Sequence, residues 1–291
     1  MIRKKILVTG SEGLLGSSLV PYLKNLDYDV IRHSRSGDTE ANGDLVDKKI
    51  VWEVLDRHSP DFIVNLAAAT NVDECEQKPN FAYLLNVRVL ENIASWIRAR
   101  QAAAYLIHIS TDQVYDGKGP HSEENVELTN YYSFSKFTGE LVASTVRSTV
   151  LRTNFFGYSK NAKRRSFSDW IIESIDSDKD ITVFEDIRFS PLSLVSLMKM
   201  IHTVLVTPKE GIYNLGSKTG ISKADFAYRL AEILDKSNAK IRKGSIFDLN
   251  LRAYRPRDMT MDVSRFEGAF KVELPTIEDE ILTLLSGRGS E

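Results

Sequence analysis

The chain has few of the residues that build metal sites or disulfides, with one cysteine, Cys75, and five histidines among 291 residues. A single cysteine excludes an internal disulfide and a cysteine-based zinc cluster, and the histidines lack the close spacing of metal ligands. We therefore expect no bound metal. Residues 1–5 lead directly into an apolar stretch that is too short for a secretory signal or a membrane span. These features favour a cytoplasmic protein without a membrane partner.

The chain also lacks a dominant charge, because 38 lysines and arginines face 40 aspartates and glutamates. A net charge of -2 does not give the broad basic field of a nucleic-acid binder, so we expect no nucleic-acid partner. The basic cluster Lys160, Lys163, Arg164 and Arg165 is too short to change this expectation, but it suits a diphosphate.

Short apolar runs alternate along the chain with segments whose apolar residues recur at helical spacing. This alternation predicts a parallel sheet with helices on both of its faces, an α/β architecture. The predicted strands are 6–8, 30–31, 62–66, 105–109 and 150–151, and the predicted helices are 14–26, 48–57, 81–100 and 135–146.

The alternation loosens after Gly157, which predicts a second domain. Residues 158–192 are polar and basic before a predicted strand at 181–184, and a further strand at 212–215 is placed to rejoin the sheet. We therefore predict a nucleotide-binding domain over residues 1–157, which the chain rejoins near 193–216. A smaller, interrupted C-terminal substrate-binding domain takes up most of residues 158–291.

Three glycines, Gly10, Gly13 and Gly16, follow the first predicted strand and open the first predicted helix. Glycines in this position let the backbone approach a pyrophosphate, which the helix N-terminus favours. The pattern predicts a dinucleotide site in a Rossmann-type doubly wound sheet, with Glu12 and Leu14 in the same turn. The alternative is a glycine turn required for packing alone.

The end of the second strand indicates which dinucleotide binds, because an acid there binds the ribose hydroxyls and repels a 2'-phosphate. This chain has Ser34 and Arg35 at that point, so we expect NADP(H) to be preferred, with NAD(H) possible. The alternative is that Arg32 and Arg35 are merely solvated. Asp44, followed by Leu45, is expected near the adenine amino group unless it only caps the next helix.

Tyr132 stands four residues before Lys136, a spacing that places both side chains on one face of a helix. A neighbouring ammonium favours ionisation of a phenol, which makes the tyrosine a candidate general acid. The alternative is a solvated surface pair, since this spacing is common by chance.

The chain resembles the extended short-chain dehydrogenase/reductases, and within them the dTDP-4-dehydrorhamnose reductase-like group. The resemblance covers nearly the whole length. Its motifs are VTGSEGLLG at 8–16, NLAAATNVDECE at 65–76, STDQVYDG at 110–117, YSFSK at 132–136, GE at 139–140 and RP at 255–256.

The resemblance implies roles for individual residues. Thr111 would hydrogen-bond the substrate carbonyl, Tyr132 would donate the proton, and Lys136 would hold the nicotinamide ribose. Ala67 and Ala68 would line the cofactor site. Asn86 resembles a buried helical asparagine of the family that supports the active-site strand.

The resemblance also implies a nucleotide-linked sugar as the substrate, although the sugar-binding half departs from the family pattern. Ser133 stands where the family often has glycine, and Phe155 where rhamnose-pathway reductases tend to have tryptophan. The expected substrate contacts are Asp112, Gln113, Asn154, Phe155, Arg164, Arg165, Arg188 and Arg255.

Gln113 distinguishes the enzyme classes that share this fold, because 4,6-dehydratases have glutamate there and an amide is not a general acid or base. We therefore predict NADPH-dependent reduction of a nucleotide-linked 4-keto-6-deoxy sugar to the 4-hydroxy sugar. A 4-epimerase and a non-catalytic regulatory subunit of the methionine adenosyltransferase type remain as alternatives, and a homodimer remains open.

Overall fold

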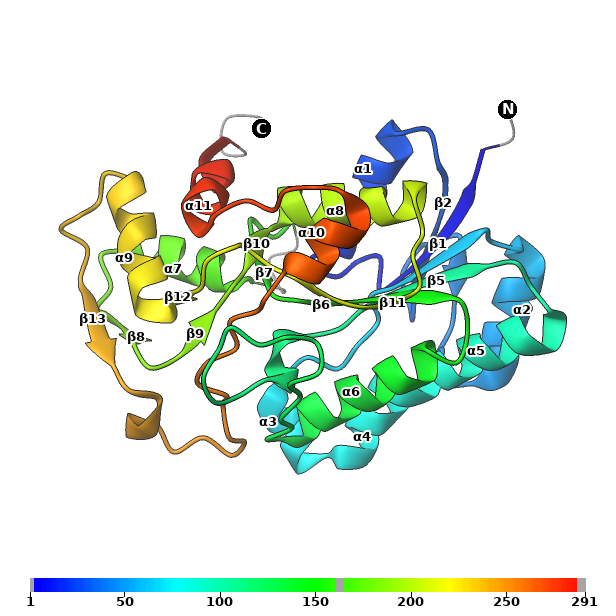
Figure 1. Ribbon diagram of the computed structural model, residues 1–291, viewed down its shortest axis with the longest axis horizontal. Helices are drawn as coiled ribbons and strands as arrows, with labels where there is room; N and C mark the ends of the chain where they lie inside the picture. The colour runs from blue at the N-terminus through cyan, green and yellow to red at the C-terminus, as the bar shows by residue number, and fades with distance from the viewer. Residues whose placement is uncertain (1–2, 161–164, 287–291) are drawn as a thin grey trace. The chain divides into compact units, whose positions relative to one another are not determined.

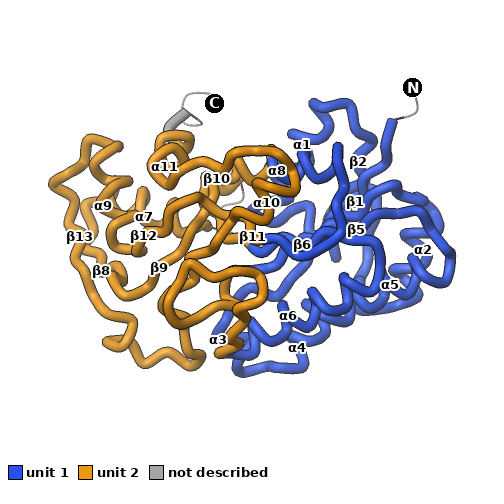
Figure 2. The backbone as a smooth tube through the Cα atoms, in the orientation of Figure 1, with its two compact units in different colours: residues 1–111, 130–152, 200–213 blue, residues 112–129, 153–199, 214–291 orange. Residues whose placement is uncertain are grey.

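The computed structural model describes residues 3–160 and 165–286, which form two compact units (Figure 2). Unit 1 comprises residues 1–111, 130–152 and 200–213, and unit 2 comprises residues 112–129, 153–199 and 214–291. Each unit is therefore assembled from segments that lie far apart in the sequence.

Unit 1 is built around a seven-stranded sheet with the strand order β11-β6-β5-β4-β1-β2-β3. The pairs from β6 to β3 are all parallel. The strands are β1 (Lys5–Thr9), β2 (Asp29–Ser34), β3 (Ala41–Asn42), β4 (Phe62–Asn65), β5 (Tyr105–Ile109), β6 (Ser148–Thr153) and β11 (Gly211–Leu215). This order is the doubly wound Rossmann arrangement extended by β11, so the predicted fold class is confirmed.

Helices cover both faces of this sheet (Figure 1). One apolar core joins the sheet to α2, α5 and α6. On the other face α1 lies beside α8, where Tyr22 makes an edge contact with the ring of His202. The helices are α1 (Gly16–Asn25), α2 (Lys48–His58), α3 (Val72–Gln77), α4 (Pro79–Tyr83), α5 (Val89–Arg100), α6 (Tyr131–Ala143) and α8 (Leu194–Val206). Because both faces are covered, all five residues of β5 are buried.

Unit 2 has its own apolar core, which includes Phe156, Phe189 and Phe226. Its short strands pair as β10 with β7, β12 with β9 and β13 with β8. The strands are β7 (Phe155–Phe156), β8 (Ile181–Phe184), β9 (Arg188–Phe189), β10 (Leu192–Ser193), β12 (Ile221–Ser222) and β13 (Ile241–Gly244). The helices are α7 (Phe167–Asp176), α9 (Lys223–Ile233), α10 (Ser264–Phe270) and α11 (Ile277–Ser286), with 3-10 turns at Asp112–Val114 and Ile246–Asp248.

Two predicted helices differ from the expectation in ways that affect the site. The predicted helix at 81–100 contains a π-helical turn at Leu84–Arg88, which separates α4 from α5. The helix α6 begins at Tyr131 rather than at residue 135, because the Asn130 side chain accepts a hydrogen bond from the Ser133 backbone N–H at 2.8 Å. None of the helices in the described residues is long and apolar enough to cross a membrane.

Candidate active site

Two glycines of the turn after β1, Gly10 and Gly16, have no room for a side chain. Gly10 has a φ of +63°, and a Cβ added to it would lie 3.0 Å from the backbone nitrogen of Ala67. A Cβ at Gly16 would lie 2.4 Å from the Gly10 carbonyl oxygen. These glycines therefore let the turn pack closely against itself and against the loop after β4. Their contact with a pyrophosphate stays a prediction.

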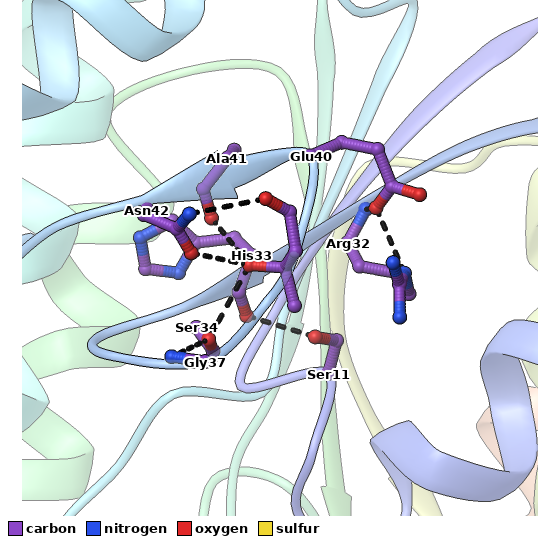
Figure 3. A network of polar contacts seen from close by, with 9 residues as sticks. Ser11, Arg32, His33, Ser34, Gly37, Glu40, Ala41 and Asn42 are labelled. Atoms are coloured by element: carbon purple, nitrogen blue, oxygen red, sulfur yellow. Dashed lines mark hydrogen bonds and ion pairs between the residues drawn. The ribbon is translucent and has the colours of Figure 1, made fainter.

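The loop after β2 uses the Ser34 hydroxyl for its own structure (Figure 3). Ser34 is buried, and its Oγ accepts a hydrogen bond from the Gly37 backbone N–H at 2.8 Å and lies 3.3 Å from the Thr39 hydroxyl. Arg32 is paired with Glu40 at 2.8 Å. Arg35 is exposed and forms no ion pair in the part of the chain that the structure describes. Arg35 is therefore the cation at this corner that can contact a phosphate.

Asp44 and Leu45 lie in the loop before α2. The Asp44 carboxylate accepts a hydrogen bond from the Val46 backbone N–H at 3.0 Å, which forms a local turn. The N-cap of α2 is Asp47, whose side chain accepts a hydrogen bond from the Lys49 backbone N–H, so Asp47 and not Asp44 caps this helix. Leu45 is buried in the core against the sheet. Adenine contacts from this loop stay a prediction.

A chain of buried polar side chains crosses the carboxyl ends of β1, β4 and β5. The Thr9 hydroxyl donates to Asn65 Oδ1 at 2.7 Å, and Asn65 Nδ2 lies 3.1 Å from His108 Nδ1. Because Asn65 Nδ2 is a donor, His108 Nδ1 must accept and the ring proton must be on Nε2. The Thr9 hydroxyl also accepts from the backbone N–H of Ala67 at 3.1 Å, which fixes the loop containing Ala67 and Ala68. No role was predicted for Thr9, Asn65 or His108, because their contacts join three different strands.

Tyr132 and Lys136 are both buried on α6, with exposed fractions of 7% and 2%. The Lys136 ammonium donates to the Ile109 carbonyl oxygen at 2.7 Å, so it lies at the end of β5. Thr111, also buried, follows that strand by two residues. The alternative, a solvated surface pair, is wrong because both side chains are buried.

Burial controls the charge on Lys136. Desolvation lowers the pKa of this lysine to about 8, and the charge of Glu140 opposes that decrease. His108 is also fully buried, and its pKa is well below the usual range because of desolvation and repulsion by Lys136. His108 is therefore neutral near pH 7, and Lys136 is the cation of the site.

Asn86, on the π-helical turn, joins two parts of unit 1. Its Oδ1 accepts from the Ala69 backbone N–H at 2.8 Å, and its Nδ2 donates to the Ser135 hydroxyl at 2.8 Å. Ser135 immediately precedes Lys136. Asn86 therefore connects the loop after β4 to α6, so its direct partners are that loop and helix rather than the active-site strand.

Unit 2 contains the predicted substrate residues, and two of them are in contact. Asn154 Nδ2 donates to the buried carboxylate of Asp112 at 2.9 Å. Gln113 lies in the 3-10 turn that begins at Asp112, and Phe155 is half-buried in β7. Phe155 therefore follows directly in sequence the residue that binds the Asp112 carboxylate.

The arginines of unit 2 that were predicted to bind substrate have different partners in the structure. Arg165 is paired with Glu173 on the surface, and Arg188 donates to the Gly220 carbonyl oxygen at 3.4 Å. Arg255 donates to the Ala253 carbonyl oxygen at 3.0 Å. Arg164 lies outside the described residues. Contacts from these arginines to a substrate stay a prediction.

Lys223, at the start of α9, is a further cation of unit 2, for which no role was predicted. Its ammonium lies 5.4 Å from the centre of the Phe167 ring and forms no ion pair within the described residues. Desolvation lowers the pKa of Lys223, the charge of Asp112 raises it, and Arg255 lowers it. No local sequence pattern marks this lysine, because its neighbours come from distant segments.

Among the described residues no group of three or more histidine, cysteine, aspartate or glutamate side chains is placed to hold a metal ion. Unit 1 contains the Thr111 hydroxyl, the Tyr132 phenol, the Lys136 ammonium and the glycine turn after β1. This set is suited to acid–base chemistry beside an organic cofactor.

Comparison with known proteins identifies a family and relatives that are named as reductases. The RmlD substrate binding domain family matches residues 4–287. The chain is 28% identical to the probable low-salt glycan biosynthesis reductase Agl14 of Haloferax volcanii, over 95% of this chain and 96% of that protein. It is also 28% identical to a dTDP-4-dehydrorhamnose reductase of Aggregatibacter actinomycetemcomitans, over 92% of this chain and 94% of that protein.

A solved structure of a dTDP-4-dehydrorhamnose reductase from Bacillus anthracis, in complex with NADP, superposes with a TM-score of 0.88. It covers 98% of this chain and 100% of that chain, at 23% identity. That likeness shows the fold, and the family match extends over nearly all of the sequence. The chain therefore belongs to the RmlD substrate binding domain family, as the extended short-chain dehydrogenase/reductase motifs predict.

Proposed function

We propose that the protein is an NADP(H)-dependent reductase that converts a nucleotide-linked 4-keto-6-deoxy sugar to the 4-hydroxy sugar. The observation that carries the proposal is the burial of Tyr132 and Lys136 on one face of α6, with the Lys136 ammonium at the end of β5. A buried phenol and a buried ammonium one helical turn apart are suited to protonating a carbonyl oxygen.

The residues of unit 1 fit the cofactor. Gly10 and Gly16 permit a tight turn that leads into the N-terminus of α1, which favours a pyrophosphate, and Arg35 is available for a 2'-phosphate. When bound, NADPH supplies the hydride that reduces the carbonyl carbon. The B. anthracis structure, which carries the same fold, is a complex with NADP.

The chain's own groups supply the rest of the chemistry. The Tyr132 phenol gives its proton to the carbonyl oxygen as the hydride arrives, and the Lys136 ammonium stabilises the phenolate that remains. The Thr111 hydroxyl donates a hydrogen bond to the same carbonyl oxygen, where negative charge develops. No water is eliminated, because Gln113 has an amide where elimination requires an acid or base.

Relatives and charges support the substrate class. The two relatives compared above are named as reductases, and one of them acts on dTDP-4-dehydrorhamnose. Unit 2 contributes Lys223, a partly buried ammonium without an ion-pair partner in the described chain. Arg255 is close enough to affect the pKa of this lysine. Two cations in one region suit a diphosphate.

The test follows NADPH absorbance while purified protein is offered a nucleotide-linked 4-keto-6-deoxyhexose, with the product checked by mass. We expect oxidation of NADPH and an increase of about two mass units in the sugar, because a hydride and a proton are added to it. The matching nucleotide-linked 4-hydroxyhexose should neither lose water nor epimerise. The free keto sugar should be a poor substrate, because the nucleotide supplies binding energy that orients the carbonyl. Absence of oxidation with every nucleotide 4-keto sugar, despite NADPH binding, would refute the proposal.

A further inference from the structure

Ser11, in the glycine turn, is hydrogen-bonded to the end of β2. Its backbone N–H donates to the His33 carbonyl oxygen at 3.1 Å, and its hydroxyl donates to the same oxygen at 3.0 Å (Figure 3). Glu12 is the next residue. A residue of the glycine turn is therefore held beside the end of β2, although 22 positions separate Glu12 from Ser34 in the sequence.

The position of the Glu12 carboxylate can be read from its distance to Gly37. A Cβ added to Gly37 would lie 2.4 and 2.6 Å from the two carboxylate oxygens of Glu12, and 2.5 Å from the hydroxyl oxygen of Ser34. Three oxygen atoms thus converge on one point in the loop after β2. The end of β2 has Ser34 where an acid would bind the ribose hydroxyls, and the carboxylate near this position comes instead from Glu12 of the glycine turn.

Side chains of both signs of charge lie around the end of β2. Arg32 is engaged by Glu40, and its pKa is raised mainly by that hydrogen bond, with a smaller contribution from the charge of Glu12. Glu12 itself forms no hydrogen bond or ion pair with the rest of the described chain, and neither does Arg35. The corner therefore presents one carboxylate and one guanidinium to a ligand.

We propose that Glu12 is the residue that limits the selectivity of this site for a 2'-phosphate, an inference that rests on the proposed function. The carboxylate accepts a hydrogen bond from the 2'-hydroxyl of NADH and repels the 2'-phosphate of NADPH. Arg35 acts in the opposite direction. NADPH is preferred, but NADH is bound as well, and the ratio of the two affinities depends on the balance between Glu12 and Arg35.

The experiment measures dissociation constants for NADPH and NADH with purified full-length protein and the variants Glu12→Gln, Glu12→Lys and Arg35→Ala. Removing one negative charge near a phosphate should raise the preference for NADPH about tenfold. Glu12→Lys should raise it further, and Arg35→Ala should reduce or reverse it. The control is Glu53→Gln on α2, which removes an exposed acid whose nearest cation is Lys49 at 3.9 Å, and it should leave the ratio unchanged.

Two further measurements separate this role from a structural one. The fragments 2',5'-ADP and 5'-AMP contain the ribose corner without the nicotinamide, so their affinities should show the same order across the variants. The effect of Glu12→Gln should also shrink as salt is raised, because screening weakens exposed charges. If both dinucleotides bind and Glu12→Gln leaves their ratio within about twofold, Glu12 does not set selectivity and the cofactor site stands. If neither dinucleotide binds the unmodified protein, the inference and the proposed function fail together.

Discussion

The guanidinium of Arg152 and the carboxylate of Glu140 form an ion pair at 2.6 Å in which the side chains are 1% and 0% exposed. The Ser110 hydroxyl donates to the same carboxylate at 2.5 Å. Ser110 precedes Thr111, and Glu140 lies one helical turn after Lys136. This buried group therefore ties the end of β5 to α6 and β6 next to the candidate catalytic residues.

Replacing either partner of this ion pair should destabilise the protein strongly. Glu140→Gln or Arg152→Met leaves a buried polar or charged group without its partner, which costs about 3–5 kcal/mol. The free energy of unfolding, from urea denaturation, measures the loss. Changing both residues together to apolar side chains should recover part of it, because no isolated charge then remains.

The exposed pair of Arg147 and Glu210 provides the control. Their side chains are 65% and 59% exposed, and their atoms lie 3.1 Å apart. Glu210→Gln should change the free energy of unfolding by less than about 1 kcal/mol. Equal losses at the buried and the exposed pair would contradict the assigned role of Glu140 and Arg152.

Tyr132→Phe should lower turnover by about a hundredfold or more, because it removes the proton donor and keeps the ring. The affinity for NADPH should be nearly unchanged. The matched control is Tyr131→Phe, since Tyr131 is the adjacent residue of the same helix and is 48% exposed. Steady-state NADPH oxidation measures both variants. Similar activities in the two would remove Tyr132 from the chemistry.

The fold of unit 1 was predictable because its strands are buried on both faces. A strand such as β5, which is apolar or uncharged throughout, gives a clear local signal. Unit 2 was less predictable, because its two-residue strands β7, β9 and β10 carry almost no pattern. The start of α6 was also missed, since its cap depends on Asn130 and Ser133 rather than on apolar spacing.

The candidate site was predictable where chemistry depends on local spacing and not where it depends on tertiary contacts. Tyr132 and Lys136 are one helical turn apart, so the sequence alone pairs them. Glu12 reaches the end of β2 through the hydrogen bonds of Ser11, and Lys223 is near Asp112 only through folding. Neither approach leaves a signal in a single sequence.

Thr111→Val should leave the fold and NADPH affinity intact and slow the hydride transfer step. The variant keeps the shape of the side chain and deletes a hydrogen bond to the developing oxyanion, which costs about a hundredfold in turnover. Single-turnover kinetics with a nucleotide 4-keto sugar isolate this step. Thr138→Val, on α6, is the control, because within the described residues the Thr138 hydroxyl bonds only the Phe134 carbonyl oxygen, at 2.8 Å. A change confined to the NADPH affinity of Thr111→Val would argue against a contact with the carbonyl.

Lys136 should make the protein less stable near neutral pH than an apolar residue would. Its pKa in the folded protein is about 8, against 10.5 when the side chain is solvated, because burial disfavours the ammonium. This difference corresponds to about 3 kcal/mol of destabilisation below pH 8. The unfolded chain binds more protons than the folded one between pH 8 and 10.5, so the penalty decreases as the pH rises through that window.

Lys136→Met should therefore raise the free energy of unfolding at pH 7 by about 1–3 kcal/mol, with part of the gain lost because the Ile109 carbonyl oxygen loses its partner. At pH 9.5 the gap to the unmodified protein should be smaller by roughly 2 kcal/mol, since Lys136 is then mostly neutral in the folded state. Turnover should be abolished at both pH values, because the variant has no ammonium to stabilise the phenolate of Tyr132. Urea denaturation at the two pH values measures the gap, with Lys78→Met as the control, since Lys78 is an exposed partner of Glu74. A gap that does not change with pH would mean that Lys136 keeps its proton throughout, and that burial does not lower its pKa.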